Sequence, residues 1–202
     1  MGSFRVLVVL VQWSDHDNRT LPSREDIDQL WNGPGNTTIV PGESVSDWMQ
    51  SNSHPTNNSQ YEYYQVQADV SDWYRLGVTE AAASFGDMGT APAGSPGLEV
   101  ILQPALENVT TNLTAYADSN GDLIGIVFVH SGYAAEQGDM DEDGVEFLNR
   151  IPSKSWVVDL EIQGGLRLQT FATVSAFRGT TGSKMAGIGY HIHEWLHARF
   201  GL

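Results

Sequence analysis

The sequence predicts an α/β (α+β) domain in which a mixed, twisted sheet is flanked by helices. The chain has 202 residues, a length that suits one domain with a sizeable core. Two continuous apolar runs, residues 4–11 and 124–130, are typical of strands buried on both faces. In other segments, apolar residues recur at helical spacing. We therefore treat residues 1–202 as one domain.

The first half of the chain contains signals for two helices and a second strand. Ser23 precedes an apolar-periodic segment with acidic residues in its first turn, which predicts a helix near 23–32. A Gly-Pro-Gly sequence ends it. A second short helix is expected to start at Ser44. Residues 61–76 alternate apolar and polar side chains and are rich in aromatic residues and Val, a pattern that predicts strand.

The second half is predicted to end in a hairpin followed by a helix. Apolar residues recur at helical spacing over 98–109, where Pro104 must kink the helix or delay its start. Two strands, near 156–162 and 167–176, flank a Gly-Gly turn. The last helix is expected over 185–198. Loops are expected over 85–97 and 139–155.

The charge of the chain argues against two classes of partner. The chain has 25 acidic and 10 basic residues, which gives a formal net charge of −15. Proteins that bind DNA or RNA need patches of Lys and Arg to neutralise phosphate, and docking on anionic membranes uses the same residues. The apolar run 4–11 is far too short to span a bilayer. We therefore expect no nucleic acid partner and no membrane insertion.

Cysteine content and glycosylation signals bear on the compartment. The chain has no Cys, which excludes disulfide scaffolds, thiol nucleophiles and Cys-ligated zinc. No signal peptide is recognisable, because the run 4–11 has no cleavage site of small residues after it. Asn-x-Ser/Thr sequons favour a secreted or extracellular protein, although polar loops of a bacterial protein would have the same composition. The sequons are at Asn18, Asn36, Asn57, Asn108 and Asn112.

The strongest chemical signal is the H-E-x-x-H motif His193-Glu194-Trp195-Leu196-His197. Residues i and i+4 share one face of a helix, so both imidazoles can face one metal ion while Glu194 reaches the water bound to it. Zinc suits two imidazoles plus an oxygen or nitrogen ligand, and it lowers the pKa of its bound water towards about 7. Glu194 would take the proton of that water and pass it to the leaving amine. The alternative is a solvated helix that happens to carry two His.

Around this motif, the chain resembles the immune inhibitor A family of zinc metallopeptidases, which typically reads G-x-x-x-H-E-F-G-H-x-x-G-L-P-D. Residues 4–15 are similar to the family's opening strand, and 45–53 to its short helix. Residues 70–74 resemble its V-x-D-W strand, and 117–136 its acidic turn, buried strand and H-A-G-x-x-x-E sequence. The resemblance spans nearly the whole chain. It implies a zincin-like metallopeptidase domain with the H-E-x-x-H on its last helix.

The resemblance implies that His193 and His197 bind zinc, that Glu194 is the general base, and that the substrate is a protein or peptide. Two departures from the family pattern stand out. Gly201 lies four residues after the second His instead of three. The chain also ends at Leu202, where the family continues into P-D and its third zinc ligand is expected. We therefore expect a zinc endopeptidase domain that is incomplete at its C-terminus.

Two acidic segments suggest a second metal. Asp139, Asp141 and Asp143 form, with a following Gly, the D-x-D-x-D-G pattern that begins a calcium loop. Arg150 stands where an EF-hand has its bidentate Glu, which excludes a normal EF-hand. Residues 118–122 have similar alternate oxygen ligands. Oxygen donors at alternate positions favour Ca²⁺, and a solvated acidic loop is an equally good interpretation of each segment.

The remaining His and one Glu are weaker ligand candidates. His191 lies on a different helix face from the motif. His130 ends a predicted strand, where a hydrogen-bonded structural His is the favoured interpretation. His16 and His54 lie in polar loops and are expected to be solvated. Glu136 matches the acid of the family's H-A-G segment, and a role in loop structure is favoured over ligation.

Two other classes of function stay open. A catalytically inactive fragment or degenerate homologue would keep the fold and act as a structural or binding module, and the position of the chain end favours this alternative. A calcium-stabilised acidic extracellular domain, in which the two His are incidental, is the third.

Overall fold

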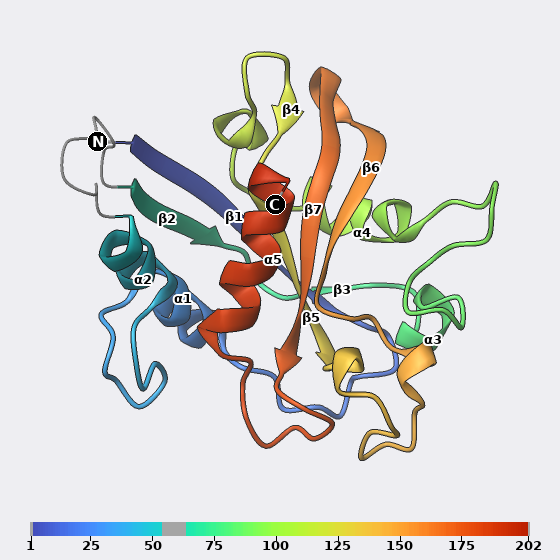
Figure 1. The fold of residues 1–202 in the computed structure, drawn as a ribbon. Helices are drawn as coiled ribbons and strands as arrows, with labels where there is room; N and C mark the ends of the chain where they lie inside the picture. Colours follow the sequence, from blue (N-terminus) through green and yellow to red (C-terminus); the bar gives the residue numbers. More distant parts are fainter. Residues whose placement is uncertain (1, 54–63, 202) are drawn as a thin grey trace.

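The computed structural model describes residues 2–53 and 64–201, which form three layers with helices on both faces of one sheet (Figure 1). The strands are β1 (Gly2–Gln12), β2 (Tyr64–Val70), β3 (Tyr74–Arg75), β4 (Asp122–Leu123), β5 (Ile126–Tyr133), β6 (Lys154–Ile162) and β7 (Leu166–Phe177). The α-helices are α1 (Arg24–Asn32), α2 (Val45–Asn52), α3 (Glu80–Ala83), α4 (Leu98–Glu107) and α5 (Ile188–Phe200). Short 3₁₀ segments are η1 (Leu113–Tyr116), η2 (Ala135–Gln137), η3 (Phe147–Asn149) and η4 (Gln163–Gly165).

The sheet is mostly parallel, with one antiparallel edge strand. Its order is β2-β1-β5-β7-β4, with β3 beside β1 and β6 beside β7. Strand β5 pairs in parallel with both β1 and β7, so the carboxyl ends of these three strands meet at one edge, where β5 and β7 end at the bottom of Figure 1. Strand β6 runs antiparallel to β7 and forms the predicted hairpin with it. The mixed sheet flanked by helices is thus confirmed.

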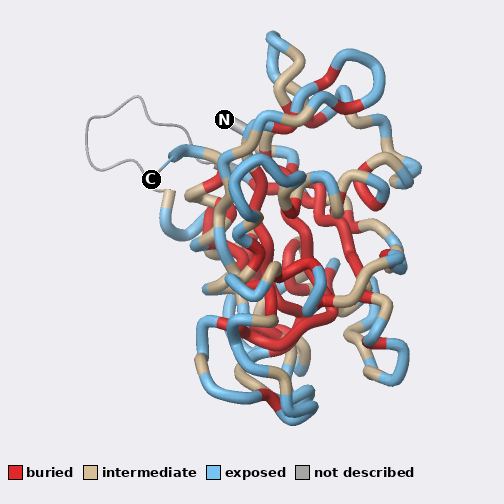
Figure 2. The backbone as a smooth tube through the Cα atoms, turned by 90° about the vertical axis from the view of Figure 1, so that its right-hand side faces the viewer, coloured by how far each residue is buried: buried red, intermediate tan, exposed pale blue. Residues whose placement is uncertain are grey.

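Strand β1 lies at the centre of the core. Val6 and Val8 pack in the layer that contains α1, α2 and α5. Leu7 and Val9 point to the other face and pack in the layer that contains α4. A strand covered on both sides needs apolar residues at every position, which is why residues 6–11, all buried, do not alternate. Figure 2 shows the buried sheet between more exposed helices and loops.

Side-chain caps fix the predicted helix starts. Ser23 forms a capping box with Asp26 at the start of α1, and Ser44 accepts a hydrogen bond from the backbone N–H of Asp47 at the start of α2. Such caps satisfy N–H groups that have no partner within the helix. Within the part of the chain that the structure describes, no helix combines the length and apolar character that crossing a membrane requires.

One predicted strand differs from the structure, and one helix was not expected. The strand expected over 61–76 is interrupted after Val70, because the Ser71 hydroxyl accepts a hydrogen bond from the N–H of Leu10 and donates one to the carbonyl of Asp72. Residues 61–63 of that prediction lie outside the described residues. The four-residue helix α3 was not predicted.

The two helices predicted in the second half also differ in detail. Helix α4 starts at Leu98 and runs on through Pro104, so the proline does not delay its start. Helix α5 starts at Ile188 instead of 185. Met185 forms an isolated β-bridge with Phe177, and the N–H of Ala186 donates a hydrogen bond to the carbonyl of Ala176 in β7. These contacts keep the two residues extended and delay the start of the helix.

Candidate metal and catalytic site

Helix α5 places the H-E-x-x-H motif between the core and solvent. Its buried face consists of His191, Ile192, Trp195 and Ala198. Trp195 is fully buried and anchors the helix to the sheet. Since residues three and four apart share a face, burial of 191, 195 and 198 turns His193 and His197 outward. The motif therefore lies on a helix, as predicted.

The two imidazoles come together in a geometry that suits a shared metal ion. The Nε2 atoms of His193 and His197 are 3.1 Å apart, and the two rings lie at 84° to each other. Two zinc–nitrogen bonds of about 2.0–2.1 Å at a tetrahedral angle place their nitrogen atoms about 3.3 Å apart. The pair thus fits two positions of a zinc site. The His193 side chain is 67% exposed, so a metal ion can reach it.

Glu194 lies next to this pair but is less exposed. Its Oε1 atom is 3.8 Å from Nε2 of His193, and its side chain is 13% exposed. Burial raises the pKa of the Glu194 carboxyl, with a smaller contribution from the negative charge of Glu136. The positive charge of the two motif His and a hydrogen bond from the backbone N–H of Ser155 oppose this rise in pKa. A carboxylate held in this way is suited to accept a proton.

The segment before edge strand β6 is fixed beside Glu194. The carboxylate of Glu136 accepts a hydrogen bond of 3.1 Å from the N–H of Ser153. This contact supports the predicted loop-structuring role of Glu136. A cavity of about 530 Å³ lies between this segment and α5, and its walls include Glu136, Ser153, Tyr190 and Glu194. The backbone N–H of Ser155 also contacts Glu194. The sequence could not predict this contact, because every residue except Pro carries a backbone N–H.

The structure supplies two of the ligands that a zinc site needs. Within residues 2–53 and 64–201, no group of three or more His, Cys, Asp or Glu side chains is arranged to hold a metal ion. His191 is fully buried in the core, where its ring lies edge-on to Trp31 at 5.6 Å, so it faces away from the motif. His54 lies outside the described residues.

The three Asp residues of the predicted calcium loop do not point to one centre. Asp141 is buried, and its Oδ1 atom accepts hydrogen bonds from the N–H groups of Asp143 and Val145. The Asp143 carboxylate pairs with Arg19. Asp139 has a positive φ of 52° at the start of the loop. The calcium site stays a prediction, and the structure gives Asp141 and Asp143 other partners.

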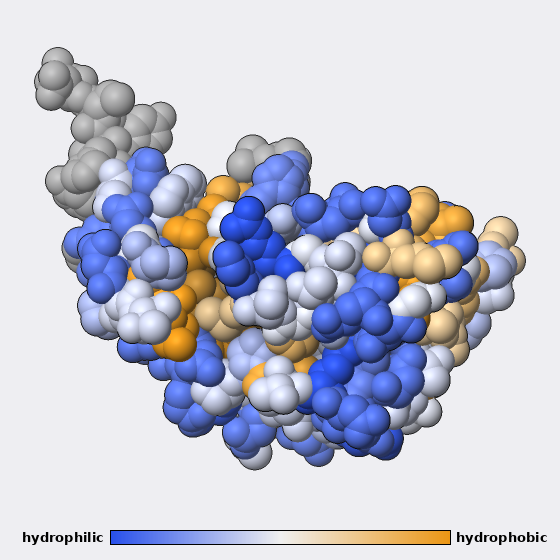
Figure 3. All heavy atoms as spheres, turned by 90° about the horizontal axis from the view of Figure 1, so that it is seen from below, coloured by the Kyte–Doolittle hydropathy of each residue, from blue (hydrophilic) through white to orange (hydrophobic). Residues whose placement is uncertain are grey.

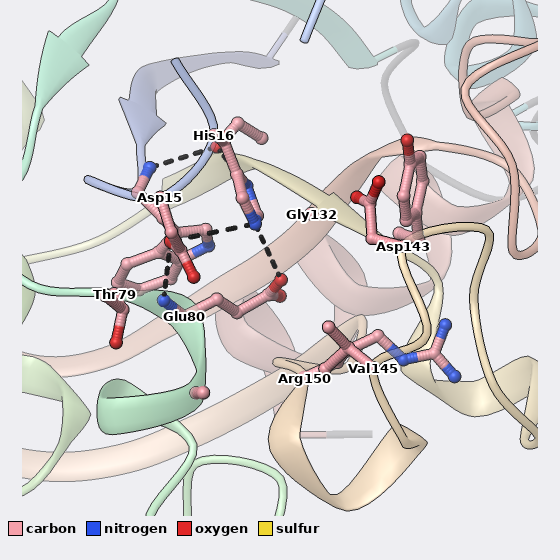
Figure 4. Close-up of polar contacts among 12 residues, drawn as sticks. Asp15, His16, Thr79, Glu80, Gly132, Asp143, Val145 and Arg150 are labelled. Atoms are coloured by element: carbon pink, nitrogen blue, oxygen red, sulfur yellow. Dashed lines mark hydrogen bonds and ion pairs between the residues drawn. The ribbon is translucent and has the colours of Figure 1, made fainter. Parts of the chain in front are cut away.

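A second His–Glu group lies buried at the carboxyl ends of β1 and β5, and the sequence did not reveal it. Glu80, at the start of α3, points its carboxylate toward His16 (Figure 4). Its Oε2 atom is 3.5 Å from Nε2 of His16, and its Oε1 atom is 3.6 Å from Nδ1 of His130. The N–H of Ile151 donates a 3.0 Å hydrogen bond to the same carboxylate. We call Glu80, His16 and His130 the buried cluster.

His16 is therefore not solvated, and that prediction was wrong. Only 4% of the residue is exposed. Its Nδ1 atom lies 2.9 Å from the Ser131 hydroxyl, a residue 115 positions away in the chain. The polar residues around His16 in the sequence concealed this burial, because its partners come from distant segments. His130 is hydrogen-bonded at Nδ1 by the N–H of Gly132, as predicted, but it lies within β5 and does not end it, because the strand continues to Tyr133.

Burial shifts the pKa of all three groups of the cluster toward their neutral forms. It raises the pKa of Glu80 to about 8 and lowers that of His130 to about 3. The pKa of His16 falls to about 4, mainly through burial and then through the nearby positive charge of Arg19. Removing charged groups from water disfavours their ionised forms, which accounts for the direction of each shift.

The whole chain was compared with known protein families and with curated proteins. A scan against models of protein families and a search of curated proteins gave no match.

Proposed function

We propose that this chain is a zinc-dependent endopeptidase that hydrolyses peptide bonds at the H-E-x-x-H motif of α5. The observation that carries the proposal is the pair of Nε2 atoms 3.1 Å apart, with the Glu194 carboxylate beside them. A zincin-like fold and a third ligand outside the described residues belong to the same proposal. Secretion, which the sequons predict, fits a peptidase.

His193 and His197 would hold the zinc ion through their Nε2 atoms. When bound, zinc polarises a carbonyl oxygen and makes a water molecule easier to deprotonate. Glu194 accepts the proton of the attacking water and donates it to the leaving amine. Its partial burial and its contact with Ser155 keep the carboxylate in one place during both transfers.

Edge strand β6 gives an extended peptide a place to bind. Among the described strands, β6 pairs only with β7, so its outer edge has free backbone groups. The N–H of Ser155 faces Glu194, and the N–H of Val157 faces the same edge because alternate residues point the same way. A substrate that adds to this edge as a further strand would place its backbone alongside Glu194. Val157 is 86% exposed, which leaves this edge accessible.

The test combines metal content with hydrolysis. We expect about one zinc per chain, bound through the two His, and casein cleavage that 1,10-phenanthroline inhibits. Glu194→Gln should keep the zinc and lower cleavage by about 10²–10⁴-fold, the usual contribution of a general base. Glu25→Gln, a change at an exposed Glu in the first turn of α1, is the matched control and should leave both unchanged.

The alternative of a binding module makes different predictions for the same experiment. Zinc bound without any cleavage would favour a non-catalytic module that keeps the two-His site. A chain that takes up no zinc at micromolar supply would contradict the peptidase proposal. In that case the His pair would be incidental to function.

A further inference from the structure

A polar cavity of about 440 Å³ lies at the carboxyl end of β2. Its walls come from three parts of the chain: Arg24 and Asp28 of α1, residues 68–74, and residues between 105 and 111 around the end of α4. None of the residues that line it belongs to α5, so the cavity is separate from the H-E-x-x-H motif. Its volume falls within the range of about 300–1,000 Å³ that is usual for ligand pockets. We call it the β2 cavity.

The β2 cavity lies where the connections of two neighbouring parallel strands part. The chain passes from β1 to α1 and α2, which pack on one face of the sheet, and from β2 to α4, which packs on the other. In open parallel sheets, ligands bind outside the carboxyl ends of the strands where connections diverge in this way. The strand also breaks here, because β2 ends at Val70 and β3 follows beside β1 only at Tyr74 (Figure 1).

Other side chains hold the polar groups of the β2 cavity in place. Hydrophilic residues cover much of the face that is seen from below, so polar walls alone do not mark a site (Figure 3). In this cavity, one oxygen of Asp69 accepts a hydrogen bond of 2.7 Å from Arg5 and a second from the Tyr116 hydroxyl. On the opposite wall, Oδ1 of Asp28 accepts a hydrogen bond of 2.8 Å from Asn32. Groups that are fixed before a ligand arrives lose less entropy when it binds.

The charges around the β2 cavity are largely paired. Asp69 forms an ion pair of 2.7 Å with Arg5, and Nε of Arg24 lies 3.9 Å from the carboxylate of Asp72. Of the carboxylates in the walls, Asp28 alone has no cationic partner among the described residues. The walls therefore have many hydrogen-bonding groups and little net charge, which suits a neutral polar ligand better than an ion.

The walls combine donors and acceptors with aromatic surface. The Asp28 carboxylate accepts hydrogen bonds, and the Thr111 hydroxyl can both donate and accept them. Trp73 and Tyr74 add half-buried aromatic rings. The indole N–H of Trp73 donates a 2.9 Å hydrogen bond to the carbonyl of Pro22, which fixes that ring. The hydroxyl groups of a sugar need both donors and acceptors, and its C–H face packs well on an aromatic ring.

A peptide cannot bind here by adding a strand to β2, because the backbone groups of this edge already have partners. The side chain of Asn32 accepts a hydrogen bond from the N–H of Ala68 and donates one to its carbonyl, both at 2.8 Å. Nε of Arg24 donates a 2.8 Å hydrogen bond to the carbonyl of Val70. A peptide that binds as an added strand would need these same groups.

We propose that the β2 cavity binds a neutral saccharide, with one sugar ring between α1 and the end of α4. The hydroxyl groups of this ring bond to Asp28 and Thr111, and its C–H face lies against the aromatic wall of Trp73 and Tyr74. The proposal does not depend on the peptidase proposal, because the cavity and the H-E-x-x-H motif share no residue. A site of this kind would attach the protein to a glycan.

Binding is measured on the whole chain by ligand-detected NMR titration in the presence of EDTA. The probes are the neutral trisaccharides maltotriose, cellotriose, mannotriose and N-acetylchitotriose, and the small cation lysinamide. We expect at least one trisaccharide to bind with a millimolar or lower Kd, and to bind more tightly than lysinamide. If none of the trisaccharides binds, or if lysinamide binds more tightly than all of them, the proposal is overturned.

Two variants place the binding in the cavity. Asp28→Ala should weaken the Kd of the trisaccharide by about tenfold, because a hydrogen bond to a charged group contributes about that factor, and Thr111→Val by about threefold. Asp87→Ala and Thr90→Val are the matched controls, since both residues are exposed and lie outside the cavity. Thr111→Val keeps the shape of the side chain, so it still decides the question if Asp28→Ala melts below its control. Equal Kd values in the cavity variants and their controls would contradict the proposal.

Discussion

The molecule contains two groups of His and Glu side chains, and they differ mainly in their contact with water. On α5, the His193 side chain is 67% exposed. In the buried cluster, the side chains of His16, His130 and Glu80 are 5%, 1% and 4% exposed. The residue types are the same, but the first group lies open to solvent, whereas the side chains of the second are almost fully covered. The second group holds segments together.

The contacts of the buried cluster show which segments of the chain it holds together. Glu80 joins α3 to the segment before β6 through the N–H of Ile151. His16 connects the loop that follows β1 with β5, through its contact with the Ser131 hydroxyl. The same hydroxyl accepts a hydrogen bond from the N–H of Trp13. Polar groups without water cost free energy unless they are paired. The hydrogen bonds of Glu80 and His16 therefore stabilise one arrangement of these segments, whereas Nε2 of His130 has no hydrogen-bond partner among the described residues. Similar side chains are therefore structural at the carboxyl edge of the sheet, whereas on α5 they stay open for the chemistry that we propose.

The largest expected contrast is in stability. Glu80→Ala should lower the free energy of unfolding by about 3–5 kcal/mol, because it leaves a buried cavity and removes the partners of Ile151 and two His. His193→Ala should change it by less than about 0.5 kcal/mol, as is usual for an exposed position. Urea unfolding in the presence of EDTA measures both without a contribution from metal. Similar losses in the two variants would mean that the two groups do not differ in their contribution to stability.

This contrast also shows what the sequence could predict. His193, Glu194 and His197 lie within five residues on one helix, so local spacing alone predicts that they come together. The strands at 4–11 and 124–130 were predicted for a similar reason, since a continuous apolar run is local information. The mixed sheet and the motif helix needed no distant contact to be recognised.

The buried cluster could not be predicted in this way. Glu80 lies 64 residues from His16 and 50 residues from His130 in the sequence. Only the parallel pairing of β1 and β5 brings the ends of those strands together, and only the unpredicted helix α3 adds the carboxylate. A polar loop in the sequence therefore gave no sign that His16 is buried. Which residues meet in the cluster depends on strand register and long-range pairing, and neither can be read from a single sequence.

The second prediction concerns pH and separates the cluster's acid from its bases. The pKa of His130 is lowered to about 3, so the unfolded chain takes up a proton below about pH 6.5 that the folded chain refuses. Stability should therefore fall as the pH drops from about 6.5 toward 3. The pKa of Glu80 is raised to about 8, so the folded chain keeps a proton that the unfolded chain loses above about pH 4.5. This group lowers stability as the pH rises from about 4.5 to 8.

Two variants resolve these opposing effects. Glu80→Gln should remove the loss of stability on the alkaline side, and His130→Gln should remove part of the loss on the acid side. We expect each to change the pH-dependent part of the unfolding free energy by about 1–3 kcal/mol, since one pKa unit corresponds to about 1.4 kcal/mol. Urea midpoints between pH 4 and 9 provide the measurement. Parallel curves for wild type and both variants would show that the cluster does not titrate differently in the folded state.

The smallest expected effect lies where the buried cluster meets solvent. Arg19 bonds to the Ser131 carbonyl at 2.8 Å on its inner side and pairs with Asp143 on its outer side. The Asp143 side chain is 50% exposed, and exposed pairs typically contribute up to about 1 kcal/mol. Asp143→Asn should therefore lower the melting temperature by only a few degrees at low salt, and by less at 1 M NaCl, where exposed charges are screened.

The same variant tests the predicted calcium loop against this pairing. If Asp139, Asp141 and Asp143 bind Ca²⁺, the ion must replace Arg19 as the partner of Asp143 and the N–H groups now bonded to Asp141. Millimolar CaCl₂ would then raise the melting temperature of wild type but not of Asp143→Asn, because a ligand that binds only the folded state stabilises it. A rise of equal size in both would place the calcium elsewhere in this acidic chain. No rise in either would leave Arg19 as the partner of Asp143, and the acidic loop would then belong to the structural rim of the buried cluster.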